Sequence, residues 1–205
     1  MPEANKKGLL IVVSGPAGSG KGTVLSHLLK AGGYRCSVSA TTRAPRPGEV
    51  NGVNYHFLTR EAFIERIARD EMLEYTEYCG NYYGTPKKEA EEVLASGCNL
   101  ILEIEVKGAA NVKRKYPEAV TIMLLPPTGE VLEARLRGRG TESEEVIQER
   151  MAQARNEIAQ LRHYDYVVYN YDNRAEEAAD IIRRIVFAEG YSTVHHPDIT
   201  DTYFA

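Results

Sequence analysis

Short, mostly apolar stretches alternate with helical patterns along most of this chain. Five stretches are rich in apolar or β-branched residues and are short enough to be buried strands: residues 9–13, 36–40, 99–104, 119–125 and 166–169. Helical periodicity separates most of them, and residues 24–29 already place several aliphatic side chains on one face of a predicted helix. Continuous apolar strands that alternate with helices indicate a parallel sheet joined by right-handed crossovers. The pattern therefore predicts an α/β fold.

Two segments depart from this alternation. Residues 41–88 are rich in Gly, Pro, Tyr and Arg and contain short alternating runs, which is typical of a small insertion that contains strands. Residues 126–165 begin with two prolines and become charged and helical, which predicts a mobile helical lid. We therefore expect a single domain with a core formed by residues 1–40, 89–125 and 166–205.

Within the predicted lid, a short signature indicates where the longer helix begins. Thr141 and Glu144 have the T-x-x-E spacing of a capping box, in which the threonine is the N-cap residue. The helix that follows this signature is expected to include Arg150 and Arg155.

Composition and charge narrow the class of function. The chain has 205 residues, of which 43% are hydrophobic and 26% charged, and its net charge is −4. These values are ordinary for one compact domain, and a negative net charge argues against a protein that mainly grips a nucleic acid backbone. Of the 25 basic residues, 16 are arginine, whose planar fork suits bidentate binding of phosphate. The composition thus favours local phosphate sites.

The sequence carries no signal for secretion, membrane insertion or zinc binding. The first eight residues, MPEANKKG, lack the apolar run of a signal peptide, and no stretch is long enough for a membrane span. The three cysteines lie far apart and have no zinc-ligand spacing. We expect a cytoplasmic protein with no membrane or nucleic acid partner, either a monomer or a homo-oligomer.

The run GPAGSGKGT is the most specific motif of the chain. It follows the first predicted strand and opens the first predicted helix, which is the arrangement that a phosphate-binding P-loop requires. Its glycines let backbone N–H groups point inward, the helix N-terminus adds partial positive charge, and Lys21 adds a full charge. The motif predicts an ATP phosphate site formed by Gly15, Pro16, Ala17, Gly18, Ser19, Gly20, Lys21, Gly22 and Thr23.

One position of this motif departs from the general pattern. P-loops have Ser or Thr directly after the lysine as a magnesium ligand, whereas this chain has Gly22 there and Thr23 next. Thr23 is therefore the candidate ligand of Mg²⁺ in the loop, either directly or through water. The GKGT ending is similar to that of nucleoside monophosphate kinases.

A second concentration of phosphate-binding chemistry follows the second predicted strand. In SVSATTRAPRPGEVNGVNYHF, Arg43 and Arg46 are three residues apart, and Pro45 and Pro47 stiffen the loop that carries them. Two restrained guanidinium groups followed by Tyr55 can surround a dianionic phosphate. From these residues alone, an arginine loop that is merely solvated at the surface stays an alternative.

Nearly the whole chain resembles the guanylate kinase family. The resemblance rests on GPAGSGKGT, SVSATTRAPRPGEVNGVNYHF, MLEYTEYCGNYYGTP, LEIEVKGA, RGRGTESEEVIQER and VYN, which extend from about residue 8 to residue 190. The TTRxPRxGE segment together with NYYGT is specific to this family. The resemblance implies a P-loop NTPase three-layer sandwich with a central parallel sheet, a small mixed β insertion that binds GMP and a helical lid.

The resemblance also implies which residues bind the acceptor nucleotide. The GMP phosphate would be held by Arg43, Arg46, Tyr55 and Tyr83. The guanine would be read by Ser39, Glu74, Thr85 and Glu105. Glu74 has a chemical reason for this role, because a carboxylate can accept parallel hydrogen bonds from the N1–H and the exocyclic amine of guanine, a donor pair that adenine lacks.

The donor side follows in the same way. Glu103 ends a predicted buried strand near the P-loop, so we expect it to bind Mg²⁺ through water, and a solvated carboxylate at a strand end stays an alternative. The resemblance places Asn170 near the adenine of ATP. The catalytic set that it implies, with Mg²⁺ as the cofactor, is Lys21, Arg46, Arg139 and Arg150. Arg137 and Arg155 are expected to be solvated. The chain departs from common family residues at Ala17, Asn54, Glu103 and Glu105.

The function implied is transfer of the γ-phosphoryl group of Mg–ATP to GMP or dGMP, giving ADP and GDP or dGDP. Two alternatives stay open on the sequence. A related P-loop kinase that acts on a sugar phosphate would share the P-loop and the arginines but would have no need of Glu74 and Thr85. A guanylate kinase-like binding module would bind protein segments, and such modules have degraded phosphate loops.

Overall fold

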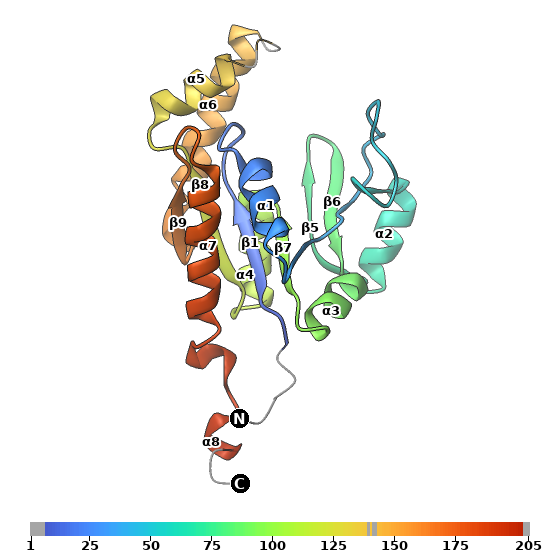
Figure 1. Ribbon diagram of the computed structural model, residues 1–205. Helices are drawn as coiled ribbons and strands as arrows, with labels where there is room; N and C mark the ends of the chain where they lie inside the picture. The colour runs from blue at the N-terminus through green and yellow to red at the C-terminus, as the bar shows by residue number, and fades with distance from the viewer. Residues whose placement is uncertain (1–6, 139, 141–142, 203–205) are drawn as a thin grey trace. The chain divides into compact units, whose positions relative to one another are not determined.

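The computed structural model describes residues 7–138, 140 and 143–202, which form two compact units (Figure 1). The first unit comprises Met1–Val12 and Gly33–Pro117, and the second comprises Val13–Gly32 and Glu118–Ala205. The boundary passes through the first strand, so that this strand contributes to both units.

One sheet has five strands in the order β2-β7-β1-β8-β9. Its strands are β1 (Leu10–Ser14), β2 (Tyr34–Cys36), β7 (Asn99–Glu103), β8 (Val120–Leu125) and β9 (Tyr166–Tyr169). β2 pairs in parallel with β7, and β8 in parallel with β9. Every residue of β1 and β8 is buried, as expected for strands that are covered on both faces. The predicted α/β class with a central parallel sheet is confirmed.

The strand predicted at residues 36–40 is wrong in its bounds. β2 ends at Cys36, residues 37–39 have no regular structure, and Ala40–Thr41 form β3 of a different sheet. The apolar pattern is continuous across this point, but the pairing partners change from β7 to β4 and β6. Periodicity alone does not reveal such a change of sheet.

The second sheet lies within the first unit and confirms the predicted small mixed β element. It consists of β3, β4 (His56–Phe57), β5 (Met72–Tyr78) and β6 (Asn81–Pro86), in the order β4-β3-β6-β5. β5 and β6 form a hairpin (Figure 1) whose turn residues Cys79 and Gly80 have φ of 47° and 75°, the left-handed conformation that two-residue hairpin turns favour. Ala40, Phe63 and Met72 form a hydrophobic cluster of buried side chains beside this second sheet.

The described residues of the first unit form three helices: α2 (Arg60–Ala68), α3 (Lys87–Ala95) and α4 (Val106–Lys115). α2 begins at Thr59, whose hydroxyl accepts a hydrogen bond from the Ala62 N–H and so caps the helix. α4 contacts β5, and α3 contacts both β5 and β7. These contacts bring the start of α4 to the strand that carries Glu74.

The second unit contains α1 (Lys21–Lys30), α5 (Gly129–Arg137), α6 (Glu144–Ile158), η1 (Leu161–His163), α7 (Ala175–Glu189), η2 (Thr193–His195) and α8 (Ile199–Thr202). α1 and α7 pack against one another (Figure 1). The apolar face of α1 buries Val24, Leu25 and Leu28, whereas Leu29, predicted on the same face, is 37% exposed. Among the described residues, no helix combines the length and apolar character needed to cross a bilayer.

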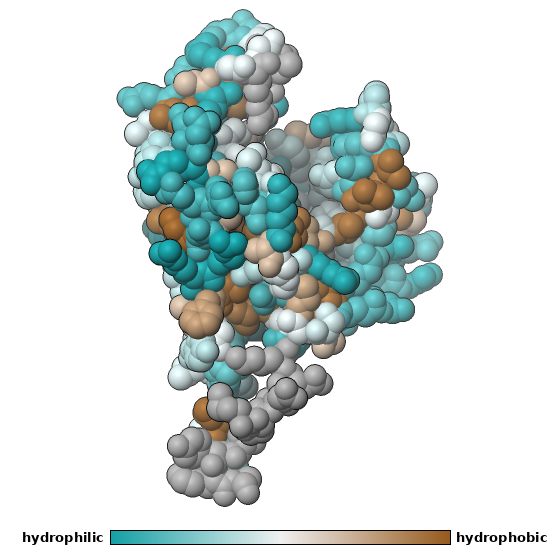
Figure 2. Space-filling view, viewed as in Figure 1, coloured by the Kyte–Doolittle hydropathy of each residue, from teal (hydrophilic) through white to brown (hydrophobic). Residues whose placement is uncertain are grey.

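α5 and α6 enclose a small core of their own. Leu132 and Leu136 of α5 are buried with Ile147 and Ala154 of α6, and Ala17 of the phosphate loop packs against this group. The visible outer surface of the two helices is mostly hydrophilic (Figure 2). The predicted capping box is wrong, because α6 begins at Glu144 with Ser143 as its N-cap residue. Thr141 lies outside the described residues, and Glu144 instead pairs with Arg137.

Candidate active site

The phosphate loop lies between β1 and α1 and is fitted closely to the strands beside it. Gly20, the N-cap of α1, has φ of +86°, and a Cβ at this position would lie 2.3 Å from Nδ2 of Asn170. A Cβ at Gly15 would lie 2.2 Å from the Leu124 carbonyl oxygen on β8. Side chains larger than hydrogen are therefore excluded at both positions, since both the backbone conformation and the space demand glycine.

The carbonyl groups of this loop are held by two side chains from distant parts of the second unit. Asn170, which is 5% exposed, donates from Nδ2 to the Ser19 carbonyl at 2.9 Å. Arg135 of α5 donates to the Gly18 and Ser19 carbonyls at 3.5 and 3.4 Å, and to the Asn170 carbonyl at 2.8 Å. Asp172 accepts from Arg135 Nη2 at 2.7 Å. These bonds fix the carbonyl side of the loop, and within the loop the Ser19 N–H donates to the Pro16 carbonyl at 3.1 Å.

Lys21 begins α1 and lies close to the loop. Its Nζ donates to the Gly15 carbonyl at 2.6 Å and to the Pro16 carbonyl at 3.4 Å. The ammonium group is therefore positioned over the loop, where a phosphate would be met by both the loop N–H groups and a full positive charge.

The two candidate magnesium donors are accessible. Thr23 is exposed on the first turn of α1, and Glu103 is exposed at the end of β7. Hydroxyl and carboxylate oxygens are the hard ligands that Mg²⁺ takes, usually one or two of them together with water and substrate phosphates. The chemistry of these donors therefore fits Mg²⁺.

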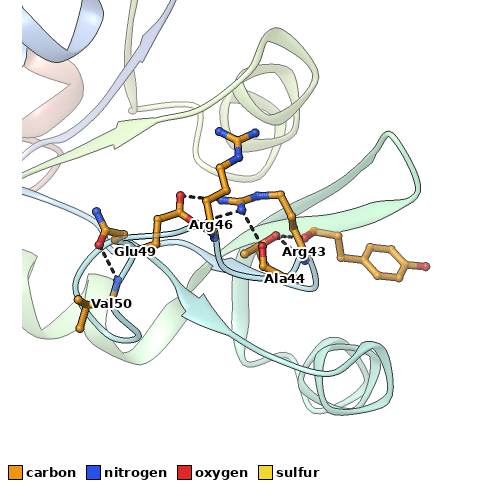
Figure 3. A network of polar contacts seen from close by, with 8 residues as sticks. Arg43, Ala44, Arg46, Glu49 and Val50 are labelled. Atoms are coloured by element: carbon orange, nitrogen blue, oxygen red, sulfur yellow. Dashed lines mark hydrogen bonds and ion pairs between the residues drawn. The ribbon is translucent and has the colours of Figure 1, made fainter.

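In the first unit, the arginine loop is organised around one carboxylate (Figure 3). Glu49 accepts from Nη2 and Nη1 of Arg43 at 2.9 and 3.0 Å, and from the Arg46 backbone N–H at 2.7 Å. The Arg43 guanidinium holds the pKa of the Glu49 carboxyl below its ordinary value. At the end of the loop, the Val50 N–H donates to Oδ1 of Asn54 at 2.9 Å (Figure 3). Asn54 is one of the positions at which the chain departs from common family residues, and its side-chain amide helps to shape the loop.

Aromatic rings surround the same arginine. The Arg43 guanidinium lies 5.4 Å from the ring centre of Tyr55, and the rings of Tyr55 and Tyr83 meet edge to face at 6.3 Å. The hydrogen bonds to Glu49 are the largest cause of the raised pKa of Arg43. The structure thus brings three of the four predicted phosphate ligands together. The fourth, Arg46, is exposed, and its side chain points away from Glu49 (Figure 3).

Glu74 lies on β5 and is 5% exposed. The Thr85 hydroxyl on β6 donates to Oε1 of Glu74 at 2.9 Å, and a Cβ on Gly108 of α4 would lie 3.2 Å from Oε2. Burial raises the pKa of Glu74 to about 7. The hydrogen bonds from Thr85 act in the opposite direction, but their effect on the pKa is smaller than that of burial. The structure therefore joins two of the predicted guanine readers in one buried polar contact.

The other two predicted guanine readers, Glu105 and Ser39, lie outside the β5–β6 hairpin. Glu105 is the exposed N-cap residue of α4, one turn before Gly108. Ser39 lies between β2 and β3, and its carbonyl accepts from the His56 N–H at 2.9 Å. Their contacts with a base stay predictions.

Of the arginines after β8, Arg139 lies outside the described residues. Arg150 is half-buried on α6, so the expected helix around it is confirmed. Arg137 pairs with Glu133 and Glu144, and its side chain is 42% exposed.

Comparisons with known proteins agree on one family. A family model described as guanylate kinase matches residues 7–189. The chain belongs to the guanylate kinase family. A guanylate kinase of Halalkalibacterium halodurans is 55% identical over 185 residues, which cover 90% of each chain. That of Streptococcus agalactiae serotype III is 51% identical over 189 residues, 91% of this chain and 90% of the relative.

The solved structure of guanylate kinase from Anaplasma phagocytophilum matches with a TM-score of 0.73 at 34% identity, covering 92% of this chain and 89% of that one. The resemblance to guanylate kinases inferred from the motifs is thus confirmed, together with the P-loop kinase fold.

The roles of Arg135 and Glu49 in holding the predicted phosphate-binding segments were not predicted from the sequence. Arg135 is three residues after Leu132 and next to Leu136, so its position on the buried face of α5 was a usable signal. Glu49 follows Pro47 and Gly48, a pair that favours a tight turn and returns the carboxylate toward the arginines. In this guanylate kinase family member, Arg135 binds carbonyls of the phosphate loop and Glu49 binds the arginine loop.

Proposed function

We propose that this protein transfers the γ-phosphoryl group of Mg–ATP to GMP or dGMP. The observation that carries the proposal is the buried Glu74–Thr85 pair, which lies in the same unit as the Arg43–Tyr55–Tyr83 cluster. A phosphate cluster alone fits many phosphorylated substrates, whereas a buried carboxylate also requires a ligand with hydrogen-bond donors. Guanine offers such a donor pair at N1–H and the exocyclic amine.

Glu74 would select the base by the cost of leaving its oxygens without donors. When guanine binds, the ionised carboxylate accepts two charge-assisted hydrogen bonds. Adenine would place a ring nitrogen acceptor against the same buried carboxylate, and a buried polar group that is left unpaired loses affinity strongly. Ser39, Thr85 and Glu105 are proposed to complete the recognition of guanine.

The transfer itself requires positioning and charge stabilisation. The nucleophile is an oxygen of the acceptor phosphate, which is already mostly ionised at neutral pH because its second pKa is near ~6. A general base is therefore unnecessary. Lys21, Arg46, Arg139 and Arg150 would stabilise the charge that spreads over the transferring phosphoryl group.

Mg²⁺ is proposed as the cofactor, with Thr23 and Glu103 as the residues that would hold it directly or through water. When bound, it would neutralise charge on the phosphate oxygens of ATP. Residues 126–165 are proposed to form the lid, which would exclude water that would otherwise compete as the acceptor.

A coupled assay of ADP formation tests the proposal, with GMP, dGMP, AMP, UMP and ribose 5-phosphate compared at equal concentration. We expect turnover with GMP and dGMP and little with the others. Equal or better turnover with AMP or UMP would remove guanine specificity. Preference for ribose 5-phosphate would favour the sugar phosphate kinase, and no turnover with any acceptor would favour a binding module.

A further inference from the structure

The turn after the arginine loop places a carboxylate against two arginines at once. The Glu49 N–H donates to the Arg46 carbonyl at 3.0 Å, which closes a four-residue turn. Pro47 presets the second position, and Gly48 at the third position has φ of +86°. This is the geometry of a type II turn, whose third position requires a positive φ. The turn reverses the chain, so that the Glu49 carboxylate meets Arg43 and the Arg46 N–H.

Two prolines limit the number of backbone donors in this segment. Pro45 and Pro47 have no N–H group, so the Arg46 N–H is the backbone donor between them, and it bonds to Glu49 Oε2 at 2.7 Å. The same carboxylate takes both terminal nitrogens of Arg43 in a fork (Figure 3). One side chain therefore fixes the backbone of one arginine and the guanidinium of the other.

The Arg43 guanidinium keeps binding capacity after this contact. Nη1 donates to the Ala44 carbonyl and to Glu49, and Nη2 donates once to Glu49, which uses three of its five N–H groups. The group also lies over the ring of Tyr55, which in turn meets the ring of Tyr83 edge to face. Glu49 thus leaves donors that can meet a phosphate alongside the tyrosines.

We propose that Glu49 is a positioning residue, which orients Arg43 and the Arg46 backbone so that both arginines are preset to bind the phosphate of the acceptor nucleotide. The inference rests on the proposed function, since it concerns the same acceptor site. Presetting a flexible arginine reduces the ordering cost that binding would otherwise carry.

A second arginine–glutamate pair in the same unit provides a matched control. Arg60 and Glu77 are also 2.9 Å apart, and Arg60 also lies over a tyrosine ring, that of Tyr82 at 4.6 Å. Their side chains are 46% and 48% exposed, compared with 18% and 19% for Arg43 and Glu49. Exposed pairs of this kind contribute little.

The decisive variant is Glu49→Gln, because the two possible roles of the carboxylate predict opposite signs. If Glu49 positions Arg43, its loss weakens GMP binding. If Glu49 instead competes with phosphate for Arg43, its loss adds net positive charge, frees the fork and tightens GMP binding. Guanosine, which lacks the phosphate, reports on the base site alone.

The experiment measures dissociation constants for GMP and guanosine by calorimetry, and the KM for ATP, in wild type, Glu49→Gln and Glu77→Gln. We expect Glu49→Gln to weaken GMP roughly tenfold or more, the scale of lost hydrogen bonds to a charged group, and to leave guanosine and ATP within about twofold. Glu77→Gln should change none of the three. Tighter or unchanged GMP binding, or an equal loss for guanosine, overturns the inference.

Combination with Arg43→Ala tests whether Glu49 acts through that arginine. In the Arg43→Ala background, Glu49→Gln should have a much smaller further effect on GMP than it has alone, because the two changes are coupled. Fully additive losses would also overturn the inference. A wild-type protein that binds neither GMP nor guanosine would refute the proposed function, whereas normal wild-type binding with an indifferent Glu49 would refute only this step.

Discussion

Residues 15–23 and residues 43–49 are both proposed to bind a phosphate, but the first segment is held in place through its backbone and the second through side chains. In the first, Asn170 and Arg135 donate to loop carbonyls, and the Ser19 N–H donates to the Pro16 carbonyl. In the second, Glu49 binds a guanidinium and one backbone N–H. We call the first segment, residues 15–23, the backbone cradle, because phosphate binding there would depend on the conformation of the backbone. We call the second segment, residues 43–49, the side-chain cradle, because phosphate binding there would depend on the orientation of long, flexible side chains.

The two segments should therefore differ in what they tolerate. A Cβ at Gly20 would meet Asn170 at 2.3 Å, while a Cβ at Gly48 has no neighbour within 4 Å among the described residues. The first segment is limited by space as well as by φ, and the second by the φ of its turn alone. Substitutions that remove a charge should act in both, and their relative sizes measure how each cradle works.

The largest effect is expected from Lys21→Ala. Lys21 provides the one full charge of the backbone cradle and contributes little to the core, so turnover should fall by about 10³-fold or more while the protein stays folded. Steady-state kinetics together with thermal unfolding check this. Lys30→Ala, at the exposed end of the same helix, is the control and should keep its activity. Substantial activity in Lys21→Ala would refute the phosphate-loop assignment.

A smaller loss is expected from Glu74→Gln. The amide replaces one acceptor by a donor that faces the donors of guanine, so GMP binding should weaken by about 2–3 kcal/mol with the KM for ATP unchanged. Glu77→Gln, on the same strand but exposed, should not change GMP binding. An unchanged KM and turnover for GMP would remove Glu74 from the site.

The pH dependence of Glu74 sharpens this prediction. Burial raises its pKa from 4.5 to about 7 in the folded protein, so the contribution of the neutral acid to stability is complete below pH 4.5 and is lost as the pH rises through 7. Guanosine binding, which uses the ionised carboxylate, should instead strengthen over that rise. Guanosine avoids titration of a phosphate. Titrations between pH 5.5 and 8, an interval of about one unit or more on each side of that pKa, should show the trend in wild type and its absence in Glu74→Gln.

The smallest of the three losses is expected from Arg135→Ala. Removal of the donors to the Gly18, Ser19 and Asn170 carbonyls should raise the KM for ATP roughly tenfold and leave GMP binding unchanged. Arg135→Lys should recover part of the loss, because an ammonium lacks the planar fork. Among the residues that the structure describes, Arg137→Ala removes the exposed ion pairs with Glu133 and Glu144, so it should cost little. The reverse order of the two alanine variants would show that the wrong arginine was assigned to the loop.

Contiguous motifs and short-range periodicity were sufficient for the family, the α/β class and most strands. Four of the five strands expected from apolar runs lie within one or two residues of β1, β7, β8 and β9. The phosphate loop could be recognised because its nine residues are adjacent in the chain, and their conformational demands are local. The segment 36–40 failed because a change of sheet leaves the apolar pattern intact.

Tertiary contacts decided which polar groups meet. Asn170 and Arg135 are 151 and 116 residues away from Ser19, and their bonds to its carbonyl depend on how β9 and α5 pack in the second unit. Thr85 reaches Glu74 only through the β5–β6 register. Residue type and spacing reveal that a donor or acceptor is present. Its partner depends on a distance in space, which is set only when the elements have packed and buried polar groups must be paired.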